Sequence, residues 1–354
     1  MLPHELHLQQ LLQTVPALRY TGGMPNVKLP AGGLTFERWQ RAAREKLAAL
    51  LGMDTFRPCE PWFEAQPAQD MGTYLRTRFS FKSEDGYRVP CYWLEPKCGL
   101  RPKALPEGPV YGPRPVMICL QGHTTGMHIS IGEAKHPGDA EKIEGGRDYA
   151  VQAAARGMCA LVLEQRGFGE CGSTPAGDPD CYRAAMSAQL LGRTLLAGRV
   201  WDVMRAIDMA QEHFTRAFGD AAEFYCMGDS GGGVATMYIA CLEPRVVKAM
   251  PVCAVCGFDY SIAAFAHCAC NYVPGIRRWF DMGDLAGMIA PRPLMVVAGE
   301  KDSIFPIVPT QDTFALIRTY YEAAGAPQNR ALHMGSEGHQ FYKEAWDGFL
   351  ELGA

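Results

Sequence analysis

The stretch EFYCMGDSGGGVATMYIAC, residues 223–241, decides the fold of this chain. At its centre, Gly228-Asp229-Ser230-Gly231-Gly232 matches the pattern G-x-S-x-G. The apolar run before the match predicts a buried strand over 224–227, and the run after it predicts a helix over 231–242. A strand, a sharp glycine turn and a helix form a nucleophile elbow, in which small neighbours hold a serine at a strained position. The alternative is an ordinary serine in a glycine turn.

The order of the partner residues separates two kinds of serine enzyme. Gly-Asp-Ser-Gly-Gly also surrounds the nucleophile of chymotrypsin-like proteases, which place His and Asp before Ser, whereas α/β-hydrolases run Ser, acid, His. The stretch AFAHC at 264–268 resembles the protease histidine motif, but it follows Ser230. A protease barrel would also continue into strands after the serine. The sequence therefore predicts an α/β-hydrolase with Ser230 as its nucleophile.

Composition narrows the function classes. A hydrophobic fraction of 48% in 354 residues supports a large core, and a net charge of −4 gives no indication of nucleic acid or an anionic membrane as partner. No run of about 18 apolar residues predicts a membrane span. The N-terminus does not resemble a signal peptide, and the 13 cysteines are scattered through apparent strands and helices. We expect reduced thiols, a cytoplasmic location and a small-molecule substrate; a homo-oligomer remains open.

The chain alternates strand and helix beyond an N-terminal segment. A helix is expected over 36–51 and a hairpin over 74–94, followed by strands over 116–120, 158–163, 224–227, 247–253, 294–298 and 331–334. The helices between them are expected over 147–156, 185–214, 231–242, 310–324 and 341–350. This order predicts the α/β-hydrolase fold, a mainly parallel central sheet flanked by helices, with an N-terminal helical and hairpin extension. We expect an extension over 1–73 and a catalytic domain over 74–354.

In an open α/β sheet the chemistry gathers in the loops at the carboxyl ends of the strands. One such loop is LQGHTTGMHIS at 120–130, in which Gly122 lets the backbone approach a developing oxyanion. We predict that the main-chain N–H groups of His123 and Gly231 form the oxyanion hole. The alternative is a glycine turn with surface histidines. The loop EQRGFGECGSTPAG at 164–177 is expected to support the site through Arg166.

Two further loops offer an acid and a base. Asp302 lies in VVAGEKDSIFP, just past a predicted strand, and His339 follows Gly338 in HMGSEGHQFYKEAW. Both come after Ser230 in the order that an α/β-hydrolase requires, which His123 and His136 do not. Asp302 is therefore the predicted acid and His339 the predicted base, with Glu300 as the nearest competitor for the acid.

The segment CAVCGFDYSIAAFAHCACNYVPG at 253–275 raises the question of a metal. Its cysteines and histidine (Cys253, Cys256, His267, Cys268 and Cys270) could form a structural zinc site. However, Cys253 lies on a predicted buried strand, and Cys-x-Cys spacing suits tetrahedral ligation poorly. We expect no metal and no cofactor. Instead, large side chains here and just beyond are expected to wall the acyl pocket: Phe258, Tyr260, Phe265, Tyr272, Trp279 and Phe280.

Several motifs together resemble a known family. The elbow GDSGGGVATMYIACLEPRVVKAM, the block HCACNYVPGIRRWFDMGDLAGMIAPRPLMVVAGEKDSIFP and the closing GHQFY are similar to acetyl-xylan-esterase-like α/β-hydrolases, relatives of the cephalosporin-deacetylase and dienelactone-hydrolase groups. RGFGECG and GRTLLAGRVWDVMRAID also resemble that family, and the match covers roughly residues 75–350. The resemblance implies Ser230 as nucleophile, Asp302 as acid and His339 as base. One departure is Gln121-Gly122 where the family usually has His-Gly.

The expected function is a serine carboxylic-ester hydrolase that works through an acyl-enzyme. It is expected to remove acetyl or other short acyl groups from small esters or acetylated sugars. The main alternative is a serine peptidase or amidase on the same fold. A non-hydrolytic binding protein is a second alternative, and a lactone hydrolase would usually carry cysteine at the elbow.

Overall fold

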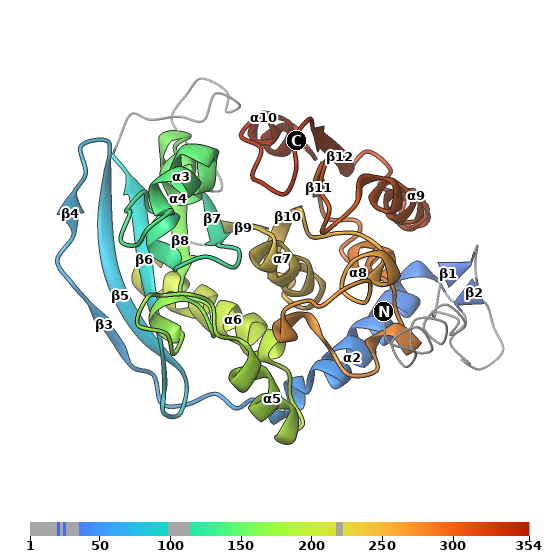
Figure 1. Ribbon diagram of the computed structural model, residues 1–354, viewed down its shortest axis with the longest axis horizontal. Helices are drawn as coiled ribbons and strands as arrows, with labels where there is room; N and C mark the ends of the chain where they lie inside the picture. The colour runs from blue at the N-terminus through green and yellow to red at the C-terminus, as the bar shows by residue number, and fades with distance from the viewer. Residues whose placement is uncertain (1–19, 22–23, 26–34, 98–113, 217–221, 354) are drawn as a thin grey trace.

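The computed structural model describes residues 20–21, 24–25, 35–97, 114–216 and 222–353 (Figure 1). Its centre is a ten-stranded sheet in the order β12-β11-β10-β9-β7-β8-β6-β5-β3, with β4 also paired to β5. The strands are β3 (Phe63–Ala65), β4 (Gln69–Asp70), β5 (Tyr74–Glu84), β6 (Tyr87–Pro96), β7 (Arg114–Leu120), β8 (Cys159–Leu163), β9 (Ala222–Asp229), β10 (Val246–Val252), β11 (Leu294–Gly299) and β12 (Arg330–Gly335). A separate two-stranded pair joins β1 (Tyr20–Thr21) and β2 (Met24–Pro25).

The strands from β7 to β12 run parallel, whereas β3 to β6 add antiparallel pairs at one side. Parallel strands covered on both faces read as continuous apolar runs, as Cys159–Leu163 of β8 does with every residue buried. Strand β5 instead largely alternates buried and more exposed residues, and the β5–β6 hairpin turns at Gly86 with φ 79°. The six predicted strands, the hairpin and the fold class are confirmed.

Helices cover both faces of the sheet (Figure 1). One face packs against α4 (Tyr149–Ala155) and α10 (Ala345–Glu351). The other packs against α2 (Phe36–Leu51), α6 (Leu195–His213), α7 (Gly231–Leu242), α8 (Met282–Gly287) and α9 (Ile307–Ala323). The remaining helices are α3 (Asp139–Lys142) and α5 (Tyr182–Leu190). Helices α2 and α7 have the predicted bounds, whereas α10 begins four residues later than predicted.

The single helix predicted over 185–214 is wrong, because the chain forms α5 and α6 with a break between them. Gly192 in the break has φ 75°, which a helix does not allow. Thr194 then starts α6 as its N-cap, and its side chain accepts a hydrogen bond from the Ala197 N–H at 3.0 Å. These two local signals end one helix and start the next.

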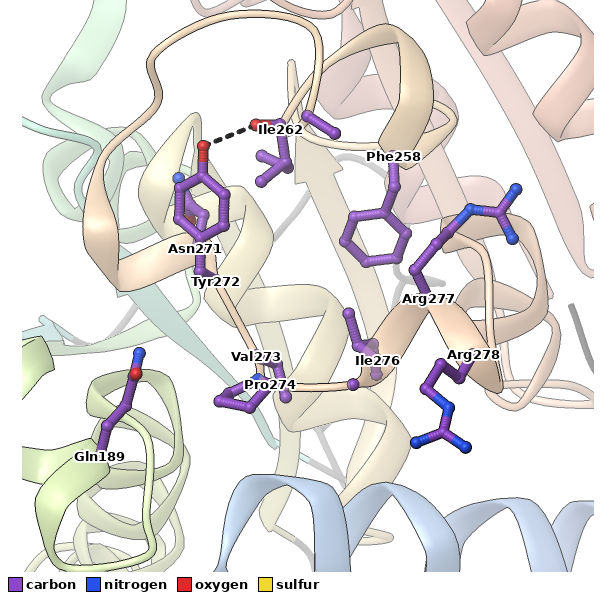
Figure 2. Close-up of a pocket in the computed structure, with 12 residues that line it drawn as sticks. Gln189, Phe258, Ile262, Asn271, Tyr272, Val273, Pro274, Ile276, Arg277 and Arg278 are labelled. Carbon is purple, nitrogen blue, oxygen red and sulfur yellow. Dashed lines mark hydrogen bonds between the residues drawn. The ribbon is translucent and has the colours of Figure 1, made fainter. Parts of the chain in front are cut away.

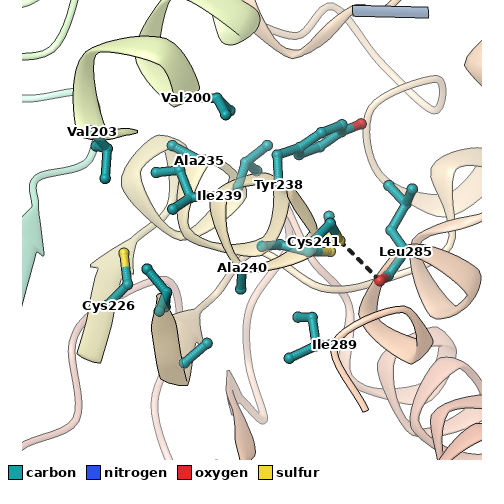
Figure 3. Close-up of a cluster of buried hydrophobic side chains, with 14 of the residues drawn as sticks. Val200, Val203, Cys226, Ala235, Tyr238, Ile239, Ala240, Cys241, Leu285 and Ile289 are labelled. Carbon is teal, nitrogen blue, oxygen red and sulfur yellow. Dashed lines mark hydrogen bonds between the residues drawn. The ribbon is translucent and has the colours of Figure 1, made fainter. Parts of the chain in front are cut away.

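Helix α7 is enclosed, with Gly231 to Cys241 all buried. Figure 3 shows Val200 and Val203 of α6 beside α7, and Cys241 of α7 donating to the Leu285 carbonyl oxygen at 3.0 Å. A Cβ atom at Gly232 would lie 2.1 Å from the Leu120 carbonyl oxygen, so no other residue fits between α7 and the end of β7. The glycines of the elbow thus let strand and helix approach as closely as the predicted turn requires.

The N-terminal segment shares the core of the sheet. Trp39 of α2 stacks on Tyr320 of α9 with ring centroids 4.7 Å apart, and β3 and β4 both pair with β5. The division at residue 73 stays a prediction, and residues 1–19 lie outside the described residues. Among the described helices, none combines the length and the apolar character that crossing a membrane needs.

Candidate active site

Ser230 lies at the turn between β9 and α7. Its backbone has φ 51° and ψ −119°, a conformation that costs an L-residue free energy and that marks a strained turn. Its N–H donates to the Val252 carbonyl oxygen of β10 at 2.8 Å. Because β9 lies between β7 and β10, the serine projects where the carboxyl ends of three parallel strands meet.

Asp302 and His339 follow the next two strands, β11 and β12, and contact each other. His339 Nδ1 lies 2.8 Å from Asp302 Oδ2, while Oδ1 accepts the N–H groups of Ile304 and Phe305 at 2.8 and 3.0 Å. Burial alone would raise the pKa of Asp302, but the hydrogen bond and the charge of His339 outweigh it, so that the pKa is lowered. Glu300, the competing acid, is exposed to solvent. The geometry favours Asp302.

Asp229, the residue before the serine, ties three loops together. Its Oδ1 accepts the Gly122 N–H at 2.8 Å, and its Oδ2 accepts Arg147 Nε at 2.7 Å. Arg147 Nη2 also donates to the His339 carbonyl oxygen at 3.5 Å. The elbow, the loop after β7 and the loop that carries His339 are therefore held in one network. Sequence reasoning missed Asp229 and Arg147 as positioning residues.

The loop after β7 comes close to the serine because residue 122 is glycine. A Cβ atom there would lie 3.1 Å from Ser230 Cβ and 2.9 Å from Asp229 Oδ1. The N–H groups of His123 and Gly231 donate to no acceptor within the described part of the chain. Gly231 opens α7, where the first N–H groups have no helical partner and the helix dipole favours negative charge. Both amides remain candidates for an oxyanion hole.

The side chain of His123 is not a solvated surface group. Its ring lies against Gly231, where a Cβ atom would come within 2.6 Å of Nδ1, and edge-on to Phe168 at 4.9 Å. On its far side, Nε2 lies 3.2 Å from Cys270 Sγ. The alternative of a loop with surface histidines is therefore wrong for His123.

A chain of rings extends from the predicted base. Phe305 stacks on His339 with centroids 5.9 Å apart, and His267 meets Phe305 edge-on at 6.0 Å. His267 Nδ1 accepts the Cys268 N–H at 3.0 Å, so the neutral ring carries its proton on Nε2. Burial lowers the pKa of His267 to about 4, which keeps it neutral. Its Nε2 has no acceptor among the described residues.

Two cavities flank this region. One of about 510 Å³ is lined by residues 179–182, Met186, residues 267–269 and Tyr272, and so reaches the ring of His267. The other, of about 380 Å³, lies between Gln189 of α5 and a loop that includes Tyr272 and Ile276 (Figure 2). None of Ser230, Asp302 and His339 lines either cavity.

The expected aromatic wall is only partly formed. Tyr260, Phe265 and Tyr272 are 60%, 42% and 40% exposed. Phe258 and Phe280 are buried in the core on the α7 side of the sheet. Phe258 and Tyr272 line the cavity of about 380 Å³, but the other rings do not, so the six do not form one acyl pocket and the sequence expectation is wrong for the set. Phe305 stacks on His339, His267 meets Phe305 edge-on, and the His123 ring lies against Gly231, next to Ser230.

The second histidine–aspartate pair in this region is buried and fully used. His128 Nε2 lies 2.8 Å from Asp139 Oδ2, which also accepts the N–H groups of Lys135 and His136. Burial lowers the pKa of His128, and hydrogen bonds outweigh burial to lower that of Asp139. This pair fixes the loop after β7, and His339 remains the candidate base.

Comparisons with known proteins were made for the whole chain. No family model matches it. The curated protein named "Putative hydrolase YtaP" from Bacillus subtilis is 20% identical over 260 residues, which cover 71% of this chain and 78% of that protein. A "putative acetyl xylan esterase" from Bacteroides fragilis superposes with a TM-score of 0.75 at 14% identity, covering 95% of this chain and 82% of that one.

The glucuronoyl esterase from Solibacter usitatus has a TM-score of 0.64 at 14% identity, covering 96% of each chain. At such identities the likeness concerns the fold. It agrees with the mostly parallel sheet flanked by helices described above. The chain is therefore similar in structure to the acetyl xylan esterases and has the α/β-hydrolase fold that its sequence predicted.

Proposed function

We propose that this protein hydrolyses carboxylic esters through an acyl-enzyme formed on Ser230. The observation that carries the proposal is the strained serine at the end of β9 together with the hydrogen-bonded pair of Asp302 and His339 after β11 and β12. A nucleophile with a base, itself oriented by a third group, is the arrangement that acyl transfer needs. The similarity in fold to structures named as esterases supports the same reaction class.

In the proposed mechanism His339 accepts the proton of Ser230 Oγ while Oγ attacks the ester carbonyl carbon. The N–H groups of His123 and Gly231 donate to the oxygen of the tetrahedral intermediate. His339 then donates its proton to the leaving alcohol. Water, deprotonated by His339, attacks the acyl-enzyme and releases the acid, and His339 returns the proton to Ser230 Oγ. Asp302 accepts a hydrogen bond from the Nδ1–H of His339 and stabilises the charged imidazolium without taking its proton.

We propose small esters with a short acyl group, such as acetylated sugars, as substrates. The rings of Phe305 and His267 extend one after the other from His339, and in this proposal they limit the space for a long acyl chain. Location in the cytoplasm, as expected from the sequence, is compatible with such soluble substrates.

The test combines labelling with turnover. A fluorophosphonate should modify the wild-type chain at Ser230, and p-nitrophenyl acetate should be hydrolysed. Ser230→Ala should lose both properties while keeping its fold, because the hydroxyl contributes little packing. Ser336→Ala, an exposed serine in the loop before His339, is the matched control and should keep both. Labelling of Ser230→Ala, or more than about a tenth of the wild-type kcat, contradicts the proposal.

A serine peptidase or amidase would pass the labelling test as well. Matched ester and amide substrates with the same acyl group separate the two functions. Faster hydrolysis of the ester supports the proposal, and comparable or faster hydrolysis of the amide favours the peptidase alternative.

A further inference from the structure

Four potential metal ligands meet beside the candidate active site. They are one histidine and three cysteines from separate parts of the chain: His123, Cys181, Cys268 and Cys270. One ligand atom from each lies within 4.8 Å of every other. His123 Nε2 is 3.2 Å from Cys270 Sγ, which is itself 3.3 Å from Cys268 Sγ.

These distances suit a tetrahedral ion. Zn–S bonds of about 2.3 Å and Zn–N bonds of about 2.0 Å place neighbouring ligand atoms about 3.4–3.8 Å apart. The contacts at 3.2 and 3.3 Å are slightly shorter and every separation is within 4.8 Å, so small side-chain rotations complete the tetrahedron. A Cys₃His set is a standard zinc ligand set. We propose that His123, Cys181, Cys268 and Cys270 bind one structural zinc ion.

The charge of the surroundings supports thiolate ligands. Arg199 is only 2% exposed, and its Nε and Nη2 donate to the neutral carbonyl oxygen of Arg166 at 3.1 and 2.8 Å. Its Nη2 donates to Cys181 Sγ at 3.3 Å, and its guanidinium lies over the Phe168 ring at 4.2 Å. A buried guanidinium requires a nearby anion. Zinc with three thiolates and a neutral histidine carries a net charge of −1, which Arg199 balances.

Zinc binding at this site exchanges thiol protons for the metal ion. Each of the three thiols gives its proton to solvent when its sulfur binds Zn²⁺, and neutral His123 donates a nitrogen lone pair. No electron is transferred. Because the protein fills all four positions, no position remains for substrate, and the ion is structural.

The site also has an entry path and a mechanical role. Cys181 and Cys268 both line the cavity of about 510 Å³, through which the ion can enter. Cys181 precedes α5, Cys268 precedes a short turn at Ala269–Asn271, and Cys270 lies within that turn. The ion would fasten these two segments to the loop of His123. This departs from the sequence expectation of no metal, which considered Cys253, Cys256 and His267 and could not place Cys181 and His123 beside the Cys-x-Cys pair.

Elemental analysis is the first test. The full chain, produced in zinc-supplemented medium and purified under reducing conditions, should contain one zinc per molecule. Cys270→Ser and Cys268→Ser should each reduce the zinc content below about a tenth of that value. Cys59→Ser changes a half-buried cysteine outside the cluster and should keep the full content. Zinc retained by both cluster variants, or absent from the wild-type protein after zinc reconstitution, overturns the proposal.

Cobalt provides a readout of geometry that does not depend on activity. Metal-free wild-type protein titrated with Co²⁺ should develop thiolate-to-cobalt charge-transfer absorption and the intense visible bands of tetrahedral coordination, and Zn²⁺ should abolish both. Cys268 is only half-buried, so Cys268→Ser is the variant expected to fold, and its circular dichroism should match the wild type. A wild-type spectrum without charge-transfer bands, or a loss of two free thiols through a Cys268–Cys270 disulfide, contradicts a zinc site.

Discussion

His339 Nδ1 lies 2.8 Å from Asp302 Oδ2, and the same carboxylate is fixed by the N–H groups of Ile304 and Phe305 through its other oxygen. A carboxylate held on both oxygens cannot rotate away from the imidazole. This contact leaves His339 Nε2 as the ring nitrogen available to a nucleophile. The arrangement leads to a direct test of which acid acts.

Asp302→Asn should lower kcat by about 10⁴-fold, because the amide favours the wrong tautomer of His339 while leaving the packing unchanged. Glu300→Gln, the matched change two residues away, should alter kcat less than about twofold, since Glu300 is exposed. Steady-state kinetics on p-nitrophenyl acetate measure both. If Glu300→Gln has the larger effect, the acid has been assigned to the wrong residue.

Arg147 should stabilise the elbow through Asp229. The Asp229 side chain is 2% exposed and Arg147 Nε donates to it at 2.7 Å. Arg147→Met leaves a buried carboxylate without its cation, which should cost about 3–5 kcal/mol in the free energy of unfolding at neutral pH. Lys301→Met removes an exposed pair with Glu337 and should cost about 0–1 kcal/mol. Urea denaturation of the two variants gives the comparison.

The pH dependence of this loss has a definite sign. Burial raises the pKa of Asp229, but Arg147 outweighs it and lowers the pKa below 3.8. The stability that this pair contributes is therefore present above about pH 4 and lost as the pH falls through the lowered value. The difference between wild type and Arg147→Met should narrow in acid. A difference that stays constant from neutral pH to acid would show that the pair does not stabilise the fold electrostatically.

Part of the site could be predicted from the sequence because its signals are local. Ser230 is recognised from glycines within two residues of it, and Asp302 from its place directly after a strand. The contacts of Asp229 with Gly122 and Arg147 have no such signal, because they join residues 107 and 82 positions apart. Only the fold brings these groups together.

The positions of the aromatic rings could not be predicted either, because they too depend on contacts that only the fold creates. An aromatic residue in a loop gives no indication of whether its ring faces the site, the core or solvent. Phe265 and His267 are two residues apart, yet Phe265 is 42% exposed while His267 packs against Phe305. The break between α5 and α6 is a different case. Gly192 and Thr194 are local signals for the end of one helix and the start of the next, but the prediction gave more weight to the apolar pattern.

Glu164 should make stability depend on pH. It is 1% exposed, accepts Gln121 Nε2 at 2.6 Å and the Met127 N–H at 3.1 Å, and burial raises its pKa from 4.5 to about 7. A raised pKa means that the stabilising contribution is present below about pH 4.5 and is lost as the pH rises through about 7. Glu164→Gln cannot titrate and should flatten the stability profile over this interval.

Glu170→Gln is the control for this prediction. Glu170 forms an ion pair with Arg78 and its pKa is lowered, because the hydrogen bond from Arg78 outweighs the effect of burial. Burial is the largest cause of the raised Glu164 pKa and the charge of Glu170 a smaller one, so the replacement of Glu170 should reduce the slope between pH 4.5 and 7 only slightly. Urea midpoints measured at several pH values provide the profiles. An equal slope in wild type and Glu164→Gln would show that Glu164 is ionised in the folded protein throughout.

The acyl preference tests the rings around His339. Wild type should have a higher kcat/KM for acetyl and propionyl esters than for octanoyl esters. A fitting methylene is worth only about 1–3 kcal/mol, so discrimination against long chains must come from steric exclusion.

His267→Ala removes a ring 6.0 Å from Phe305 and should raise kcat/KM for butanoyl and hexanoyl esters relative to acetyl by about tenfold. Phe265→Ala, which shortens a more exposed neighbour, should leave the ratio unchanged. Wild-type turnover of octanoyl esters as fast as acetyl esters would contradict the short-acyl proposal. An unchanged ratio in His267→Ala would instead place the limiting wall elsewhere, because the ring removed would then not face the acyl chain.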